Sequence, residues 1–553
     1  MNTARYAKQW FANLINPIAS RRVPLRRCGP ERGIRRGVQV AGHRCPAHMT
    51  DRRQGETVRR IHELLQKGDP SHVAITDHDG VDYTYADLSR LVEDMAARLS
   101  GYGIRPGDRV MLLSENSVTY LAATLALGRL DAWTLLANAR LTAAEVDRLA
   151  QVADIRCTIY TPEVSPAARG HAARMGGISL GRLDCGELLV SPLRDAVPEP
   201  VEEGPGQTAI LIYTSGTVGE PKGVMLSHGN LLFTAQTSST LRRISDGDVT
   251  LALLPGTHIF GLTSVFLAAL SKGSRIIAMP RFDADTVLEC LREDVTILPA
   301  VPQVFAALLR RLSELGVERL EHRRLRYIYA GGAPLDLGIK QRVERVFGLP
   351  LHNGYGQTEA SPGIATTRIE SPRSDTSVGL AAPGTEVRVH DPNEHGVGEL
   401  WVRGPNVMKG YYRNPEATRT TLTGDGFLRT GDLARQDPDG AIHIVGRLKE
   451  LIVHSGFNVY PPEVEAVLSL HPAVSLSAVV GRARDGDEDV IAFVTTQSEV
   501  TEAELRNWLR ERLAPYKVPA RIVIADAVPQ AVTGKILKSK LLDHFRDQLE
   551  QKE

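Results

Sequence analysis

The sequence lacks several features that would assign it to particular classes of protein. No run of 18 apolar residues occurs, so a transmembrane helix is not expected. The five cysteines show no C-x-x-C pairing, which argues against a zinc site or a disulfide framework and suits a reducing compartment, here the cytoplasm. The formal net charge is only +1 over 553 residues, so the composition gives no general attraction to nucleic acid or to membranes.

Positive charge is concentrated at the N-terminus. Residues 1–48 hold nine arginines and one lysine against a single acid, Glu31. Arginine-rich, acid-poor leaders resemble organelle transit peptides. Because Met49 opens an ordinary polar segment, the favoured interpretation is instead a start codon assigned too early. Under either interpretation, the prediction for residues 1–48 is a disordered basic leader.

The rest of the chain is too long for one hydrophobic core, and its helix and strand patterns alternate. Thr84 and Asp87 can cap a helix that stops near Gly101. Apolar runs predict strands at 109–113, 209–213, 276–279 and 295–298. This alternation predicts an α/β fold with mostly parallel, helix-covered sheets. Residues 196–207, rich in proline, glycine and acids, are predicted to form a surface linker.

The pattern changes near Gly446. Short strands with fewer helices follow, including apolar runs at 479–482 and 490–494, and Thr501 with Glu504 can cap a further helix. These last residues, about a hundred in number, are predicted to fold as a small α+β domain of their own.

The most informative segment is the loop Thr214–Gly223, TSGTVGEPKG. It contains three hydroxyls, three glycines and a lysine directly after the apolar run 209–213. Glycine allows the backbone to approach a ligand closely, and exposed N–H groups, hydroxyls and an ammonium suit a polyphosphate. The loop is not a Walker A motif, since no stretch fits G-x-x-x-x-G-K-[ST], and Gly534-Lys535 is followed by Ile536.

Residues 211–228, LIYTSGTVGEPKGVMLSH, resemble the AMP-binding loop of the adenylate-forming superfamily. That superfamily includes acyl-CoA synthetases, firefly luciferase and the adenylation domains of peptide synthetases. Further motifs follow in the family's order: LPGTH (254–258), GGAP (331–334), YGQTE (355–359), GEL (398–400), RTGDL (429–433), GRLK (446–449) and TGK (533–535). The resemblance, from about residue 55 to 545, implies a large N-terminal domain (49–445), a hinge (446–450) and a mobile C-terminal lid (451–553).

The resemblance also implies ATP and Mg²⁺ as ligands, with coenzyme A as a co-substrate. It assigns the phosphates of ATP to Thr214, Ser215, Gly216, Thr217, Gly219 and Lys222. Val218 departs from the family pattern, which usually has threonine or serine there. Glu359 resembles the family's Mg²⁺ ligand, and Thr358 resembles the hydroxyl beside the α-phosphate.

The nucleoside is assigned to later motifs. Tyr355 resembles the ring that stacks on adenine, and Asn353 is expected to read the adenine edge. Asp432 resembles the carboxylate that binds both ribose hydroxyls, with Arg447 nearby, because an ionised carboxylate is an acceptor only. The glycine-rich turns that line the nucleotide and acyl pockets are assigned to Gly331, Gly332, Ala333, Gly354 and Gly356.

Four residues are implied in the reaction itself. His258 resembles the histidine beside the reacting carboxylate, and Lys535 resembles the mobile lysine that bridges this carboxylate and the α-phosphate. Lys449 holds the family's hinge position, about which the lid rotates after adenylation. Gly456 lies in the segment SGFNVYP, which resembles the wall of the thiol tunnel, and would permit close approach of pantetheine.

The leading functional prediction is an acid–CoA ligase for a medium- or long-chain fatty acid, because GGAP and SGFNVYP resemble bacterial fatty acyl-CoA ligases. One alternative is an aryl acid–CoA ligase. A second is an adenylating enzyme that loads a carrier protein, weakened by the absence of an attached carrier domain near residue 553. A third is a nucleotide-binding regulator without catalysis, which the intact Glu359, Asp432, Arg447 and Lys535 oppose. A homodimer is left open.

Overall fold

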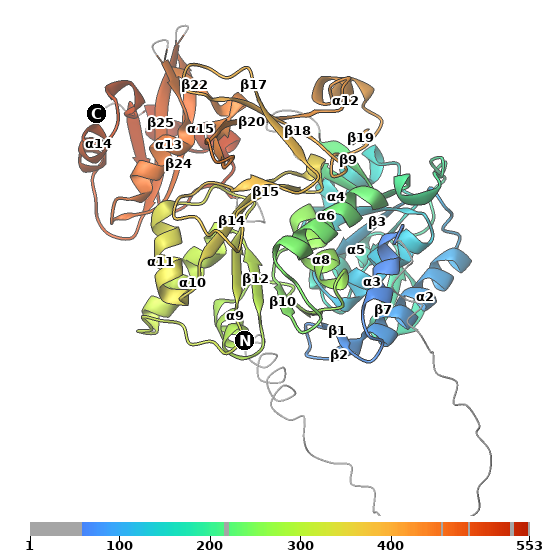
Figure 1. The fold of residues 1–553 in the computed structure, drawn as a ribbon. Coiled ribbons are helices and arrows are strands. Elements are labelled where there is room, and N and C mark those ends of the chain that lie inside the picture. The colour runs from blue at the N-terminus through green and yellow to red at the C-terminus, as the bar shows by residue number, and fades with distance from the viewer. Residues whose placement is uncertain (1–57, 215–220, 455–456, 485–486, 531–535, 551–553) are drawn as a thin grey trace, which may run out of the picture. The chain divides into compact units, whose positions relative to one another are not determined.

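The computed structural model describes residues 58–214, 221–454, 457–484, 487–530 and 536–550 (Figure 1). The expectations for residues 1–48 therefore lie outside the described residues. So do those for a set of predicted site residues: Ser215, Gly216, Thr217, Gly219, Gly456 and Lys535. None of the helices within the described ranges is long and apolar enough to cross a membrane.

The largest sheet has nine strands. In spatial order they are β16 (Leu380–Ala381), β15 (Gly363–Thr366), β14 (Leu351–Gly356), β13 (Tyr327–Ala330), β12 (Ile297–Ala300), β10 (Val249–Ala252), β11 (Arg275–Ala278), β1 (Val73–Thr76) and β2 (Asp82–Thr84). The run from β14 to β1 is parallel, and antiparallel strands close both edges. The site motifs GGAP and YGQTE follow β13 and end β14, at the carboxyl ends of neighbouring parallel strands.

A second sheet has eight strands. Their order is β19 (Gly410–Tyr411), β9 (Lys222–Ser227), β8 (Thr208–Thr214), β4 (Trp133–Asn138), β3 (Arg109–Ser114), β5 (Cys157–Tyr160), β7 (Gly186–Val190) and β6 (Ile178–Leu183). Its centre, β8-β4-β3-β5, is parallel and almost entirely buried, which explains the continuous apolar sequence of β3. The outer pairs are antiparallel.

Helices accompany these sheets, as the alternation predicted (Figure 1). They are α2 (Tyr85–Tyr102), α3 (Val118–Arg129), α4 (Ala143–Val152), α5 (Pro166–Arg174), α6 (His228–Leu241), α7 (Ile259–Gly261), α8 (Ala268–Leu270), α9 (Ala284–Glu293), α10 (Pro302–Glu314) and α11 (Leu337–Phe347). The capping box of Thr84 and Asp87 at the start of α2 is confirmed. The helix ends close to the predicted stop near Gly101: it continues to Tyr102, and Gly103 in place of Gly101, at φ 113°, ends it in the left-handed conformation.

A third sheet, wholly antiparallel, contains β17 (Glu386–His390), β18 (Gly398–Arg403), β20 (Leu428–Gln436) and β21 (Ile442–Arg447). Short helix α12 (Pro415–Thr421) lies in the chain between β19 and β20. The sequence analysis did not predict this sheet. It matters for the site because its register pairs Asp432 directly with Arg447.

The C-terminal residues form smaller sheets with their own apolar core. The strands are β22 (Ile452–His454), β23 (Phe457–Val459), β24 (Val474–Arg484), β25 (Asp487–Thr496) and β26 (Arg521–Ile524). The helices are α13 (Pro461–Ser469), α14 (Glu502–Arg510), α15 (Leu541–His544) and α16 (Arg546–Glu550). Val464, Leu468, Leu505 and Leu509 are buried in one cluster with the strands, so the predicted small α+β fold is confirmed.

Candidate active site

The phosphate loop connects two antiparallel strands. Strands β8 and β9 pair up to Thr214 opposite Lys222, and the tip between them lies outside the described residues. Within the described part of the chain, the two-residue strand β19 is the one strand beyond β9 in this sheet. Lys222 is partly buried, and its Nζ lies 4.9 Å from the centre of the Tyr411 ring.

Glu359 lies in a short 3-10 turn, Thr358–Ala360, two residues beyond the end of β14. One of its carboxylate oxygens, Oε1, accepts a hydrogen bond of 2.9 Å from the hydroxyl of Tyr411. Thr358 beside it is buried. A carboxylate oxygen is the hard ligand that Mg²⁺ prefers, so Glu359 fits the role of a magnesium ligand.

Two glycines of the YGQTE region are required by close packing. A Cβ at Gly354 would lie 1.9 Å from the Tyr329 hydroxyl oxygen, and a Cβ at Gly356 would lie 1.8 Å from the Pro362 carbonyl oxygen. Any larger residue at either position would displace the end of β14, where Tyr355 is placed. These glycines therefore shape the site whether or not they contact nucleotide.

Three residues of the GGAP turn follow directly after β13. Gly331 is buried, Gly332 is exposed with a positive φ of 77°, and Ala333 is half-buried. The backbone thus turns sharply at the carboxyl end of a strand, which suits a pocket wall.

The side-chain amide of Asn353 is hydrogen-bonded to other residues of the protein. Its amide donates to the carbonyls of Thr376 (3.0 Å) and Ser377 (3.2 Å), while its oxygen accepts from the Gly354 N–H. An amide nitrogen has two hydrogens, and both are used here. The expectation that Asn353 reads the adenine edge is therefore limited to its carbonyl oxygen, and the observed role is to fix the strand before Tyr355.

Asp432 is the acceptor at the centre of the second half of the site. It is 2% exposed; its Oδ2 accepts from the Tyr355 hydroxyl, and its Oδ1 lies 3.0 Å from Arg447 Nε. Burial, and then the charge of Asp432, hold the pKa of Tyr355 well above its ordinary value. The same carboxylate raises the pKa of Arg447. Tyr355 therefore stays a donor and Arg447 stays charged, so Asp432 is presented as a pure acceptor, as a ribose diol requires.

Glu399 stabilises the turn that carries the Asp432 carboxylate. It accepts from the Gly431 N–H (2.9 Å) and from Trp401 Nε1 (2.8 Å), while the Asp432 N–H donates to the Thr430 hydroxyl (3.1 Å). The motif GEL was noted in the sequence without a role for its glutamate. The structure gives it one, since Glu399 holds the turn that carries Asp432.

His258 is exposed and begins a helix. Its Nδ1 accepts from the Phe260 N–H at 3.3 Å, which leaves the ring proton of the neutral histidine on Nε2. The helix continues as a π-helical turn over Leu262–Leu267, a distortion often found at functional sites. Phe260 is buried, and its Cε1 lies 3.3 Å from the position that a Cβ of Gly331 would take. Phe260, two residues after His258, thus lies against the GGAP turn.

Two buried residues that the sequence analysis missed hold the loop before His258. The Asn116 amide donates to the carbonyls of Ala252 (2.9 Å) and Leu254 (2.8 Å), and its oxygen accepts from the Gly256 N–H (2.6 Å). The Tyr120 hydroxyl donates to the Gly256 carbonyl. Both lie far from this loop in the sequence, so only the fold could reveal them.

Lys449 lies in the 3-10 turn Leu448–Glu450, which follows β21 directly, and its side chain is exposed. Its role as a hinge stays a prediction. Two chains of contacts link further site residues. One runs from Lys222 through Tyr411 to Glu359, and the other runs from Tyr355 through Asp432 to Arg447. Cations, a hard oxygen ligand and a diol acceptor together suit the activation of a carboxylate by ATP.

Comparison with known proteins agrees with this site. The family model for AMP-binding enzymes matches residues 65–412, and that for the AMP-binding enzyme C-terminal domain matches residues 463–535. A feruloyl-CoA synthase from Amycolatopsis is 36% identical over 488 residues, covering 86% of this chain and 96% of that protein. The rice 4-coumarate–CoA ligase 5 is 33% identical over 494 residues, covering 84% and 89%. The o-succinylbenzoate CoA synthetase of Bacillus subtilis, solved with ATP and magnesium, superposes with a TM-score of 0.74 at 28% identity, covering 88% and 99%.

The fold and the site define an AMP-forming acid–CoA ligase. The chain belongs to the AMP-binding enzymes, and the resemblance seen in its motifs is confirmed. The expectation of a fatty acid as substrate is not supported by the feruloyl-CoA synthase and the 4-coumarate–CoA ligase, which are named for hydroxycinnamic acids.

Proposed function

We propose that the chain activates an aryl carboxylic acid, of the hydroxycinnamate type, and transfers it to coenzyme A with release of AMP and pyrophosphate. The observation that carries this proposal is the similarity to feruloyl-CoA synthase and 4-coumarate–CoA ligase over more than four-fifths of the chain. It replaces the fatty-acid interpretation with the aryl alternative.

The residues around the GGAP turn support an aromatic substrate. Phe260 is 6% exposed and meets Tyr329 edge-on, with ring centres 5.8 Å apart. Both rings approach the position that a side chain at Gly331 would occupy. Flat, rigid aromatic walls favour a planar acid through edge-to-face and stacked contacts, and they give a flexible alkyl chain less room to follow.

In the first half-reaction, a carboxylate oxygen of the acid would attack the α-phosphorus of ATP. The new bond is an acyl–phosphate anhydride, and the bond from the α-phosphorus to the bridging oxygen breaks, so that pyrophosphate leaves. Lys222 would hold the leaving phosphates and Asp432 the ribose hydroxyls. Glu359 would hold Mg²⁺, which when bound neutralises phosphate charge. The Nε2–H of His258 would be a donor for the carboxylate.

In the second half-reaction, the thiol sulfur of coenzyme A would attack the acyl carbon and lose its proton to solvent. The bond from the acyl carbon to the phosphate oxygen would break, and AMP would leave with the bonding electrons. We infer that residues 446–450 are the hinge and residues 451–553 the lid that makes this second step accessible. Lys449 would be the residue about which the lid rotates, and Gly456 would permit close approach of the pantetheine arm of coenzyme A. Lys535 would serve only the first half-reaction.

Pyrophosphate release from ATP, measured with one acid at a time, tests the proposal. The panel contains ferulate, 4-coumarate, cinnamate and benzoate against octanoate and palmitate, each with and without coenzyme A. We expect hydroxycinnamates to give the highest kcat/KM, and thioester to form only when coenzyme A is present. Glu359→Gln is the control for background hydrolysis. Faster turnover of an alkanoate than of every aryl acid would overturn the assignment of the substrate.

A further inference from the structure

A short segment joins the metal-binding and phosphate-binding halves of the candidate site. Residues 408–413, here called the strap, run from Glu359 to the phosphate hairpin. The Met408 N–H donates to the Glu359 carbonyl at 2.9 Å. Strand β19 within the strap then pairs with β9, and the Tyr412 N–H donates to the Gly223 carbonyl at 2.7 Å. The strap is therefore fixed by backbone contacts at both ends.

Tyr411 in this strap contacts both functional side chains. Its hydroxyl donates to Glu359 Oε1 at 2.9 Å, and its ring lies against the Lys222 ammonium at 4.9 Å. One side chain thus orients the carboxylate and provides a cation–π contact for the lysine.

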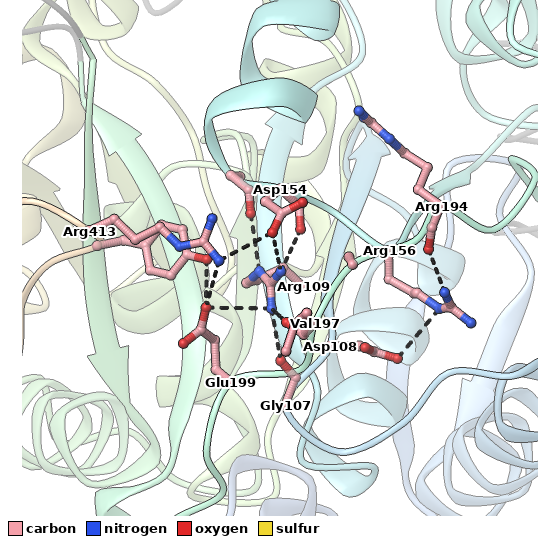
Figure 2. Close-up of polar contacts among 12 residues, drawn as sticks. Gly107, Asp108, Arg109, Asp154, Arg156, Arg194, Val197, Glu199 and Arg413 are labelled. Carbon is pink, nitrogen blue, oxygen red and sulfur yellow. Dashed lines mark hydrogen bonds and ion pairs between the residues drawn. The ribbon is translucent and has the colours of Figure 1, made fainter.

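The next two residues of the strap are anchored in an ion cluster around the buried Arg109, drawn in Figure 2. The Tyr412 hydroxyl donates to Glu199 at 2.7 Å, and Arg413 lies 3.3 Å from the same carboxylate and 3.2 Å from Asp154. Arg109, wholly buried, completes the cluster at 3.1 Å from Asp154 and 3.6 Å from Glu199. The charges of two cations and two carboxylates cancel, so the strap is bound to a cluster that is neutral and well hydrogen-bonded.

We propose that Tyr411 is a positioning residue that orients Glu359 toward the metal and Lys222 toward the phosphates. The proposal rests on the function proposed above, because it needs Glu359 and Lys222 in those roles. A hydrogen bond to a ligating carboxylate fixes the direction of its free lone pairs before the metal arrives. The strap gives this donor a defined place, since its backbone is tied to Glu359 and to β9.

The test separates the hydroxyl from the ring by measuring ATP binding by calorimetry, once with Mg²⁺ and once with EDTA, without any acid. Tyr411→Phe removes only the donor to Glu359. We expect the increase in ATP affinity caused by Mg²⁺ to be about tenfold smaller in this variant than in the wild type, while the ATP affinity in EDTA stays unchanged. Tyr411→Leu also removes the ring from Lys222, and we expect weaker binding in EDTA as well.

Tyr102→Phe is the matched control, because its hydroxyl donates at 3.1 Å to the Ser191 carbonyl, outside the strap and its cluster. It should bind ATP like the wild type under both conditions. If Tyr411→Phe lost the same ATP affinity with Mg²⁺ as with EDTA, the damage would be general and the proposal would be overturned. It would also be overturned if Mg²⁺ increased the ATP affinity of this variant as much as that of the wild type. If the wild type itself gains no affinity from Mg²⁺, the proposed function fails first, so the two failures are distinguishable.

Discussion

The strongest structural prediction concerns Arg109, the buried centre of the cluster in Figure 2. Its guanidinium has five N–H groups, and five acceptors surround them. They are the carbonyls of Gly107 (3.4 Å), Ala153 (3.1 Å), Asp154 (2.7 Å) and Val197 (2.8 Å), and the carboxylate of Asp154 (3.1 Å). The side chain is 0% exposed, so water cannot replace these donors if they are removed.

Arg109→Met keeps the length of the side chain and removes every donor. Removing one partner of a buried ion pair costs about 3–5 kcal/mol, and buried carbonyls left without donors cost about 1–3 kcal/mol each. Asp154 and Glu199 are 38% and 21% exposed and can regain some water, which limits the total. We expect a loss of about 3–5 kcal/mol. Arg109→Lys keeps the charge with three donors for five acceptors, and should lose about 2 kcal/mol.

Urea unfolding followed by circular dichroism, with hydrogen exchange over β3 and the strap, measures both variants. Arg156→Met is the matched control, since its guanidinium bonds one carbonyl, that of Arg194, and lies 3.9 Å from Asp108. It should lose about 1 kcal/mol or less. If Arg109→Met were no less stable than this control, the argument from buried, fully bonded donors would be refuted.

Three further predictions address the site, the lid and pH. Asp432→Asn removes the charged acceptor and should weaken AMP binding in calorimetry by about tenfold or more. Lys535→Ala should slow acyl-AMP formation about 10²-fold and leave thioester formation from supplied acyl-AMP unchanged. Lys449→Pro should leave acyl-AMP formation unchanged and slow thioester formation. Each half-reaction is assayed alone, and equal losses of rate in both steps for both variants would contradict the prediction. Burial opposes ionisation of Asp248, but hydrogen bonds led by that from Arg326 lower its pKa to about 2, from 3.8. The stability that Arg326 adds is therefore present above about pH 4 and lost towards pH 2, so urea midpoints of Arg326→Met and wild type should converge on acidification.

The sequence allowed candidate site residues to be assigned where their chemistry is local. Tyr355 and Glu359 lie within five residues of one another, and Asp432 sits in an equally short motif, so each could be assigned without the fold. The helix capped by Thr84 and the buried strand at Arg109 were predictable for the same reason, because capping and burial patterns depend on a short stretch of consecutive residues.

Contacts between distant segments could not be predicted in this way. Tyr411 meets Glu359 across 52 residues, and Asn116 meets Gly256 across 140. Neither belongs to a motif, and an isolated tyrosine or asparagine is compatible with many environments. The predicted surface linker at 196–207 is mostly exposed and contains no strand or α-helix, as expected. The contact of Glu199 with Tyr412 could not be predicted, because the position of Tyr412 depends on the pairing of β19 with β9.

The identity of the acid illustrates the same limit for function. The motifs are assigned to the phosphates, the metal and the ribose, which would be common to every acid that such a ligase activates, so these assignments carry no information about the acyl group. Phe260 and Tyr329 approach Gly331 from separate elements, a helix start and a strand. Their combined shape exists only in the fold, whereas the fatty-acid prediction rested on the likeness of GGAP and SGFNVYP to bacterial fatty acyl-CoA ligases. A substrate preference should accordingly follow Phe260 and Tyr329, while the ATP affinity follows the motifs.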